Sequence, residues 1–191
     1  MPTSLRQLLV AVRAIVALTV VFGVIWPLAM TGWAQVINRQ GANGSIVTVA
    51  GHEAASSLLA QDFTGPTWFH ARPSVAGDGY DAMSSGGSNL APSSSELVAE
   101  VAKRHAAVAA EEGCAPSDVP PDAVSASGSG LDPDISTAYA ALQAPRVARE
   151  NGLTLDVVTA LIDDATHGGV ISSQVVNVVA LNAAIAAKVS R

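Results

Sequence analysis

The sequence predicts one N-terminal transmembrane helix followed by a single mixed α+β (α/β) soluble domain. Three observations lead to this expectation. The stretch from Ala14 to Asn38 contains no charged residue and is long enough for a helix to cross a bilayer. The rest of the 191-residue chain suits one domain. In that part, apolar residues recur at helical spacing in some segments and form short strand-like runs in others, as in domains that combine helices with a sheet.

The apolar N-terminal run has two interpretations, a membrane anchor and a secretory signal peptide. An anchor is favoured because the run exceeds the roughly 7–15 apolar residues of a signal peptide, and because bulky Trp33 occupies the position expected for cleavage. Trp26 and Trp33 also suit a membrane interface. The expected organisation is therefore a cytoplasmic N-terminus (1–13), a transmembrane helix (14–36) and a soluble domain (37–191).

The charges predict the orientation of the chain and exclude some functions. Arg6 and Arg13 precede the span and Arg39 alone follows it closely, so the positive-inside rule places the domain outside the cell. That domain has eight Lys and Arg against sixteen Asp and Glu, a formal net charge of −8, which argues against nucleic-acid binding. A single cysteine, Cys114, excludes an internal disulfide and a Cys-based zinc site.

The first half of the domain is expected to hold one strand and two helices. Ser45–Val49 is a strand candidate, and apolar spacing predicts a short helix over His52–Gln61. Residues 64–95 lack periodicity, but their aromatic residues argue for order. A capping box formed by Ser93 and Glu96 opens a helix that ends at Gly113.

The second half predicts two further strands and three helices. Val124–Ser127 is a strand candidate, and Asp132-Pro133 is expected to open a helix that breaks or kinks at Pro145 and resumes to Gly152. The remaining expected elements are a helix over Thr154–Ala165 that is terminated by Gly168-Gly169, a strand over Val175–Val179 and a final helix over Leu181–Val189.

Two loops rich in Gly and Ser, residues 84–90 and 125–131, have a possible anion-binding pattern. Successive N–H groups in such loops can converge on a phosphate. A tight turn is favoured in both cases, because no Lys or Arg lies within ten residues of the first loop, and Asp132 and Asp134 after the second would repel phosphate. Neither loop has the P-loop pattern of nucleotide hydrolases.

No catalytic pattern is present. The four histidines lack metal-ligand spacing, no serine lies in a GxSxG motif, and nothing assembles an acid, a base and a nucleophile. The residues alone therefore indicate an anchored binding or assembly module that is not an enzyme on its own and has no metal site.

Several segments, taken in order, resemble the C subunit of the prokaryotic high-affinity potassium-translocating P-type ATPase, the Kdp system. The similarity extends over essentially the whole chain. The segments that carry it are Trp68–Ser74 (WFHARPS), Tyr80, Ser85–Ser93 (SGGSNLAPS), Ser125–Ser136 (SASGSGLDPDIS), Gln143–Ala148 (QAPRVA), Asn177-Val178 and Leu181-Asn182.

This resemblance implies a non-catalytic subunit of an ATP-driven potassium uptake complex in the plasma membrane of a prokaryote. Its partners would be a potassium-binding, channel-like subunit, an ATP-hydrolysing P-type subunit and a small membrane subunit. It would assist assembly and act as a catalytic chaperone that raises the ATP affinity of the hydrolysing subunit. It would hold no cofactor of its own, with ATP and Mg²⁺ bound in the assembled complex.

The resemblance also implies roles for individual residues. Gln143 matches a glutamine implicated in nucleotide contact, and the loop Ser85, Gly86, Gly87 and Ser88 resembles the signature loop of ABC-type ATPases. Structural or assembly roles are implied for Arg72, Pro73, Asn89, Ser127, Gly128, Ser129, Gly130, Asp132, Pro133, Asn177 and Asn182. From its helical position we expect Gln143 to lie on a helix surface, where its replacement would cost little stability.

Two alternatives stay open. The domain could face the cytoplasm and contact nucleotide through Gln143 and the Gly/Ser loops, or the chain could be a secreted domain of another class. Topology separates the first alternative from an outward-facing subunit, and an intact N-terminus on the mature protein argues against the second.

Overall fold

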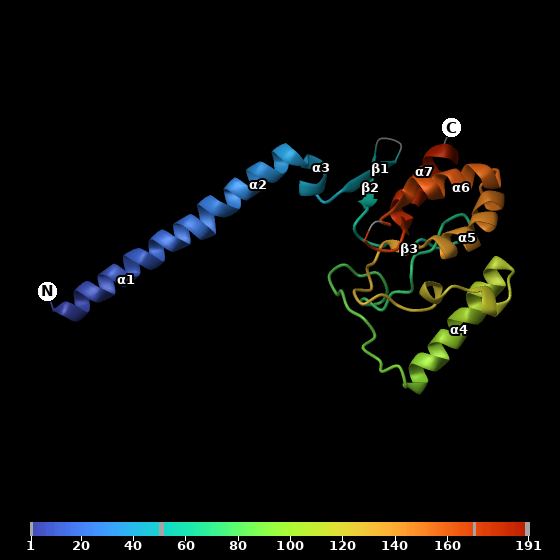
Figure 1. Ribbon diagram of the computed structural model, residues 1–191, viewed down its shortest axis with the longest axis horizontal. Coiled ribbons are helices and arrows are strands. Elements are labelled where there is room, and N and C mark those ends of the chain that lie inside the picture. Colours follow the sequence, from blue (N-terminus) through green and yellow to red (C-terminus); the bar gives the residue numbers. More distant parts are fainter. Residues whose placement is uncertain (1, 50–51, 170, 190–191) are drawn as a thin grey trace. The chain divides into compact units, whose positions relative to one another are not determined.

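The structure is a computed structural model that describes residues 2–49, 52–169 and 171–189 (Figure 1). The chain divides after Ser45 into two compact units. An N-terminal apolar helix precedes a domain that mixes helices and strands, which confirms the predicted fold class.

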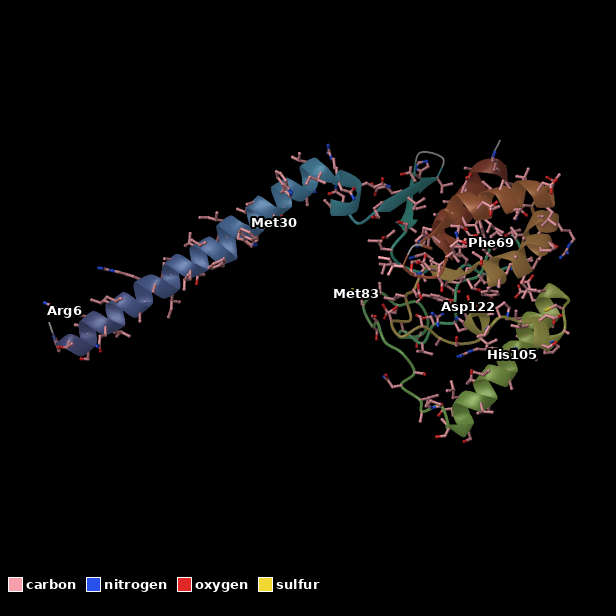
Figure 2. All side chains as sticks on the ribbon, viewed as in Figure 1. Arg6, Met30, Phe69, Met83, His105 and Asp122 are labelled. Atoms are coloured by element: carbon pink, nitrogen blue, oxygen red, sulfur yellow. The ribbon has the colours of Figure 1, made fainter. Side chains whose placement is uncertain are left out.

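The N-terminal unit is dominated by one long helix. It consists of α1 (Thr3–Val20), a π-helical stretch η1 (Val21–Ile25) and α2 (Trp26–Ile37), followed by the short α3 (Arg39–Ala42). The helix from Thr3 to Ile37 has 35 residues and is long and apolar enough to cross a membrane. Its most apolar stretch is not buried against other parts of the described chain. Side chains project from all sides of this helix (Figure 2).

The second unit begins with an antiparallel hairpin of β1 (Ile46–Val49) and β2 (His52–Ser56), which has a bulge between Val47 and Thr48. Strand β1 confirms the predicted strand. The helix predicted over His52–Gln61 is wrong, because these residues pair with β1 and then turn. Leu58, an apolar residue of this segment, is 60% exposed.

Helix α4 (Ser95–Glu112) follows a long segment in which the described residues form neither helix nor strand. Ser94 is its N-cap, with a side chain that accepts the Leu97 N–H at 3.5 Å, so the predicted cap Ser93 is off by one residue. The helix ends as predicted at Gly113, where a φ of 67° is the left-handed conformation that glycine tolerates.

Two 3₁₀ turns, η2 (Pro116–Asp118) and η3 (Pro121–Ala123), follow α4. The strand predicted over Val124–Ser127 is wrong. The carbonyl groups of Ser125 and Ala126 accept hydrogen bonds from the Arg72 guanidinium at 3.4 Å, so a side chain takes the place of a neighbouring strand.

The predicted helix start at Asp132-Pro133 is also wrong. These residues lead into β3 (Asp134–Ser136), and α5 (Thr137–Glu150) begins only after Ser136, whose hydroxyl accepts the Tyr139 N–H at 3.0 Å. Helix α5 continues through Pro145 without the predicted break and ends near Gly152.

Helix α6 (Leu155–Ala165) confirms the predicted helix, with Thr154 as its N-cap. Strand β4 (Thr166–His167) comes before the predicted terminator Gly168-Gly169. Strand β5 (Val175–Asn177) is shorter than predicted, and α7 (Val178–Val189) starts three residues early because the Asn177 side chain accepts the Ala180 N–H at 2.9 Å.

A three-stranded antiparallel sheet in the order β3-β5-β4 joins these helices. Helices α5, α6 and α7 are grouped on one side of the domain (Figure 1). The core is mostly aliphatic. Its largest fully buried apolar side chains are Phe69, Ile135, Val147, Val158, Val176, Val178, Leu181 and Ile185.

Candidate functional site

Residues 66–70 form an irregular segment that runs through the centre of the domain. Phe69 is fully buried among the helices (Figure 2). The Asn182 side chain on α7 accepts the Phe69 N–H at 2.9 Å and donates to the Phe69 carbonyl at 2.9 Å. Gln143 on α5 does the same for His70, accepting at 2.7 Å and donating at 3.1 Å. Two side-chain amides thus replace the strand partner that this backbone lacks.

Arg146 completes this arrangement one helical turn after Gln143. Its Nη1 donates to the carbonyl groups of Pro66 at 2.6 Å and Trp68 at 2.9 Å. Its Nη2 donates to Oε1 of Gln143 at 3.0 Å, and its Nε donates to Glu112 at 3.0 Å. All three guanidinium nitrogens therefore have acceptors, which permits a charged side chain to be 3% exposed.

Asn151 extends the same pattern at the end of α5, where its Nδ2 donates to the Thr67 carbonyl at 2.7 Å. We call Gln143, Arg146, Asn151 and Asn182 the polar clamp. The side chains of Gln143, Arg146 and Asn182 occupy helix faces that are otherwise apolar, because the backbone of residues 66–70 needs donors and acceptors there. The expectation that Gln143 lies on a helix surface is wrong, since its side chain is fully buried.

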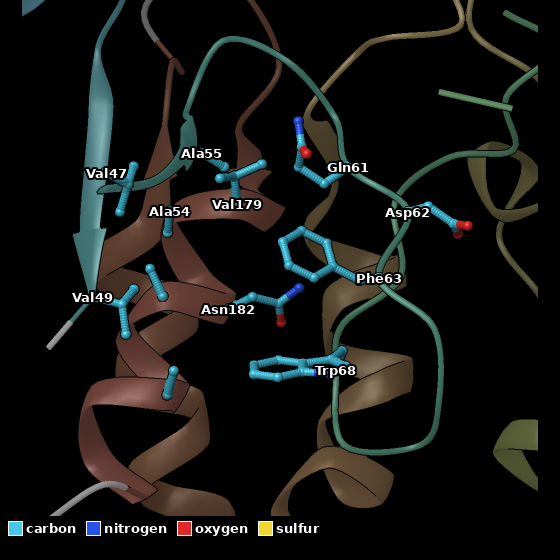
Figure 3. A pocket seen from close by; sticks show the side chains of 12 residues that line it. Val47, Val49, Ala54, Ala55, Gln61, Asp62, Phe63, Trp68, Val179 and Asn182 are labelled. Carbon is cyan, nitrogen blue, oxygen red and sulfur yellow. The ribbon is translucent and has the colours of Figure 1, made fainter. Parts of the chain in front are cut away.

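The clamp fixes one wall of an apolar groove of about 510 Å³. Phe63 and Trp68, with ring centroids 6.0 Å apart, face the valines of β1 across the groove, and Asn182 lies between them (Figure 3). Because Arg146 and Asn182 hold the backbone beside Trp68, the indole ring is positioned by the clamp. The groove has the size and apolar lining common in binding pockets.

The two Gly/Ser loops contact each other. The Gly86 N–H donates to the Ser129 carbonyl at 2.9 Å, and the Ser85 hydroxyl donates to the same oxygen at 2.9 Å. The N–H of Gly86 is therefore engaged with protein. Among the described residues, no hydrogen bond joins either loop to Gln143. We call the contact between residues 84–90 and 125–131 the glycine junction.

Close backbone approach explains the glycines at this junction. Gly130 has a φ of 68°, and a Cβ added there would lie 2.7 Å from the Ala76 Cβ and 2.8 Å from the Gly86 carbonyl oxygen. A Cβ on Gly87 would lie 3.0 Å from the Gly128 carbonyl oxygen. Gly128 differs from both, because its Cβ would meet nothing within 4 Å.

The remaining predicted residues of these loops are distributed around the junction. Ser127 is 5% exposed and its carbonyl accepts the Gly130 N–H at 3.3 Å. Ser88 and Asn89 are exposed, and Asn89 has a φ of 52°.

Arg72 connects the junction to the rest of the domain. Its guanidinium forms an ion pair with Asp132 at 3.2 Å, and its carbonyl accepts the Tyr80 hydroxyl at 2.9 Å. Burial, with a smaller contribution from Asp62, raises the pKa of Tyr80 to about 12. Pro73, which follows Arg72, is half-buried. Ser74 then donates through its hydroxyl to the Gly130 carbonyl at 2.6 Å.

Asn177 and Pro133 join the sheet to α7. The Asn177 Nδ2 donates to Asp134 Oδ1 at 3.2 Å and to the Ser57 carbonyl at 2.8 Å. The Pro133 carbonyl accepts the Val178 N–H at 2.9 Å. Within the described residues, no group of three or more His, Cys, Asp and Glu side chains is arranged to hold a metal ion.

Comparison with known proteins identifies the family. Residues 8–187 match the family described as "KdpC: K+-transporting ATPase, c chain". The chain belongs to the KdpC family. It is similar to the potassium-transporting ATPase KdpC subunit of Mycobacterium bovis, with 45% identity over 185 residues that cover 94% of this chain and 97% of that protein.

Other KdpC subunits are as similar. That of Kineococcus radiotolerans is 44% identical over 184 residues, covering 95% of this chain and 93% of its own. That of Rhodospirillum rubrum is 46% identical over 184 residues, covering 95% of each chain. The family proposed from the ordered motifs is therefore confirmed.

Arg146 and Asn151 were not assigned roles from the sequence, although Arg146 lies in a segment that carries the family resemblance. One signal was available for Arg146. Gln143 and Arg146 are three residues apart on a helix, and the neighbouring positions Ala140 and Val147 are apolar. Two polar side chains on such a face indicate a buried network. No local pattern marks the contact of Asn151 with Thr67 or that of Glu112 with Arg146, because each joins residues more than 30 positions apart.

Proposed function

We propose that the chain is a single-pass, non-catalytic subunit of an ATP-driven potassium uptake complex, with its soluble domain outside the cell. The observation that carries this proposal is the family match over residues 8–187 together with the apolar helix Thr3–Ile37. The chain assembles with a potassium-binding, channel-like subunit, an ATP-hydrolysing subunit and a small membrane subunit.

The polar side chains of the domain support a non-catalytic role. Gln143 uses both atoms of its amide to hold His70, and Oε1 also accepts from Arg146. The glycine junction binds protein backbone through Gly86 and Ser85. We infer that any effect of this subunit on the ATP affinity of the complex is transmitted through assembly, while ATP and Mg²⁺ are bound by the hydrolysing subunit.

Orientation is tested with a membrane-impermeant maleimide on intact cells. In a Cys114→Ser background, Met83→Cys supplies a thiol at a position that is 95% exposed. A matched variant, Ser4→Cys, lies at the opposite end of the span. We expect Met83→Cys to be labelled in intact cells and Ser4→Cys only after lysis. The reverse pattern would overturn the outward orientation and favour a cytoplasmic, nucleotide-contacting domain.

The anchoring role is tested by deleting residues 1–34. We expect the truncated chain to lose stable copurification with the other subunits, because the helix offers apolar surface that the rest of the protein does not cover. Full assembly and potassium transport by the truncated chain would contradict an anchoring role.

A further inference from the structure

The apolar groove beside the polar clamp is shaped by one face of α7. Val179, Asn182, Ala183 and Ala186 line it, and their spacing of three or four residues places them on the same side of that helix. This face lies between the β1–β2 hairpin and the segment that carries the two aromatic rings (Figure 3). Because two of the four side chains are single methyl groups, the groove between these elements stays open.

The polar side chains of the groove are largely engaged with the protein. Both amide atoms of Asn182 bond the backbone of Phe69. The Gln61 Nε2 donates to two backbone carbonyl groups, at 3.2 and 3.3 Å. The Asp62 carboxylate points away from the rings (Figure 3). A pocket that recognises a polar solute needs several convergent polar groups, and this groove offers few of them.

The rest of the lining determines which ligand fits. Of the twelve lining residues, seven are Ala or Val and two are Phe63 and Trp68. Both aromatic rings are half-buried, so the groove leaves apolar surface in contact with water. The hydrophobic effect favours covering such surface with an apolar group. The volume of about 510 Å³ lies within the range of roughly 300–1,000 Å³ that is usual for ligand pockets. The fitting ligand is therefore an apolar chain.

A hydrogen-bonded elbow keeps the start of this groove close to the end of the membrane helix. The side-chain amides of Gln35 in α2 and Asn43 bond each other in both directions, at 3.1 and 3.3 Å. Asn43 Nδ2 also donates to the Arg39 carbonyl at 2.7 Å. Val47, the first lining residue, follows Asn43 by only four positions, so the chain allows at most about 14 Å between their Cα atoms.

The end of the helix indicates which apolar molecules are near. Val36 and Ile37 are 83% and 66% exposed, and Trp33 is 64% exposed. Exposed apolar and indole side chains at the end of a membrane helix contact acyl chains and the interface. The covalent chain therefore keeps β1 within reach of lipid, whereas nothing comparable bounds the distance to an apolar segment of another protein.

We propose that the groove between α7 and the β1–β2 hairpin is a binding site for an acyl chain of a membrane lipid. The chain lies against the rings of Phe63 and Trp68 and the valines of β1. The head group stays in water, because the one charged lining residue, Asp62, points out of the groove. This inference goes beyond the proposed function and requires from it only that the apolar helix anchors the protein in a bilayer.

Trp68 serves as the reporter in the test. The chain has three tryptophans, so Trp26→Phe with Trp33→Phe leaves Trp68 as the only one. This full-length chain is inserted into nanodiscs of dioleoylphosphatidylcholine, or of the same lipid brominated on its acyl chains, because bromine quenches tryptophan at contact distance. We expect Trp68 to lose about half of its emission in the brominated nanodiscs, since its ring lines the groove.

Two groove variants and a matched control, made in the same background, locate the quencher. Ala183→Asp places a carboxylate in the groove, and Ala186→Phe fills the groove with a ring. Ala187→Asp adds the same charge at an exposed position outside the lining. We expect both groove variants to reduce the quenching about threefold or more, because a charge beside an acyl chain is costly and a filled groove has no room, and the control to retain it.

Circular dichroism verifies that each variant is folded, and Ala186→Phe decides the question if Ala183→Asp is not. Emission that brominated lipid leaves unchanged would overturn the inference, because no acyl chain would then reach Trp68. Equal quenching in Ala186→Phe and Ala187→Asp would also overturn it, since the ring would meet the bilayer without the groove. Quenching that disappears in the assembled complex would identify another subunit as the occupant and equally refute a lipid site.

Copurification with the nanodiscs separates this inference from the proposed function. If the chain copurifies with nanodiscs and Trp68 is not quenched, only the acyl-chain site is refuted. If the chain does not copurify, the membrane anchor fails and the inference fails with it.

Discussion

The polar clamp and the glycine junction hold irregular backbone in two different ways. In the clamp, buried side chains from α5 and α7 satisfy the N–H and carbonyl groups of residues 66–70. In the junction, two loops approach so closely that backbone groups bond each other, as between Gly86 and Ser129. The clamp depends on buried polar side chains, whereas the junction depends on glycines, which have no side chain to separate the two loops. Substitutions should therefore destabilise the two regions for different reasons.

The largest expected effect is in the clamp. Arg146→Met should lower the free energy of unfolding by about 3–5 kcal/mol, because it leaves the Glu112 carboxylate without its guanidinium partner in a buried site. The Glu112 side chain is only 2% exposed and lies 2.9 Å from Arg146 Nη2. Urea denaturation of the purified chain in detergent measures this difference.

The matched control is Arg149→Met, on the same helix, whose side chain is 66% exposed. It should change the free energy of unfolding by less than about 0.5 kcal/mol. Equal effects of the two substitutions would mean that the buried network does not hold residues 66–70.

An intermediate effect is expected in the junction. Gly130→Val should lower the free energy of unfolding by about 3 kcal/mol, which combines the cost of a left-handed backbone conformation with steric overlap against Ala76 and Gly86. Gly128→Val, two residues earlier, has open space at its Cβ and serves as the control. The difference between the two glycines should be visible in the same urea denaturation experiment, and its absence would contradict a sterically determined junction.

The smallest effect concerns Tyr80, beside the junction. The pKa of its phenol is raised from 10.0 to about 12 by burial, so above pH 10 the unfolded chain loses this proton while the folded chain keeps it. Stability is therefore fully present below pH 10 and falls as the pH rises towards 12, by about 1 kcal/mol after allowance for partial exposure.

Tyr80→Phe should reduce that alkaline loss and also lower stability at pH 8 by about 1 kcal/mol, because the hydrogen bond to the Arg72 carbonyl is removed. Some loss above pH 10 should remain, since burial also raises the pKa of Tyr139. Thermal unfolding at pH 8 to 11 measures both quantities. An unchanged pH profile in Tyr80→Phe would show that Tyr80 does not contribute.

Local patterns predicted the elements that depend on local chemistry. Helix α6 and the end of α4 at Gly113 follow from a cap, a periodic apolar stripe and a left-handed glycine. The predicted helix over His52–Gln61 failed because pairing with β1 outweighs local helical spacing. The prediction of a strand over Val124–Ser127 failed because carbonyl groups of this segment accept hydrogen bonds from Arg72, which is more than 50 residues away in sequence.

The candidate site was predictable in part for the same reason. The ordered motifs marked Gln143, Asn182 and both Gly/Ser loops, but their spacing gave no information about which backbone groups they meet. The clamp joins residues 73 to 113 positions apart in sequence, and no pattern within one segment can reveal such a contact. The burial of Gln143 follows from the same long-range contacts, which is why its expected surface position was wrong.

The central claim is that Gln143 is a structural residue of the clamp. Gln143→Ala removes the acceptor for the His70 N–H and the donor to the His70 carbonyl, so we expect a loss of about 2–3 kcal/mol in the free energy of unfolding. The most direct test is the apparent ATP affinity of complexes that retain the variant in full stoichiometry. We predict a change of less than about threefold, roughly 0.65 kcal/mol. A tenfold loss of ATP affinity in an intact complex, with the stability of the chain unchanged, would contradict the claim and place Gln143 in contact with nucleotide.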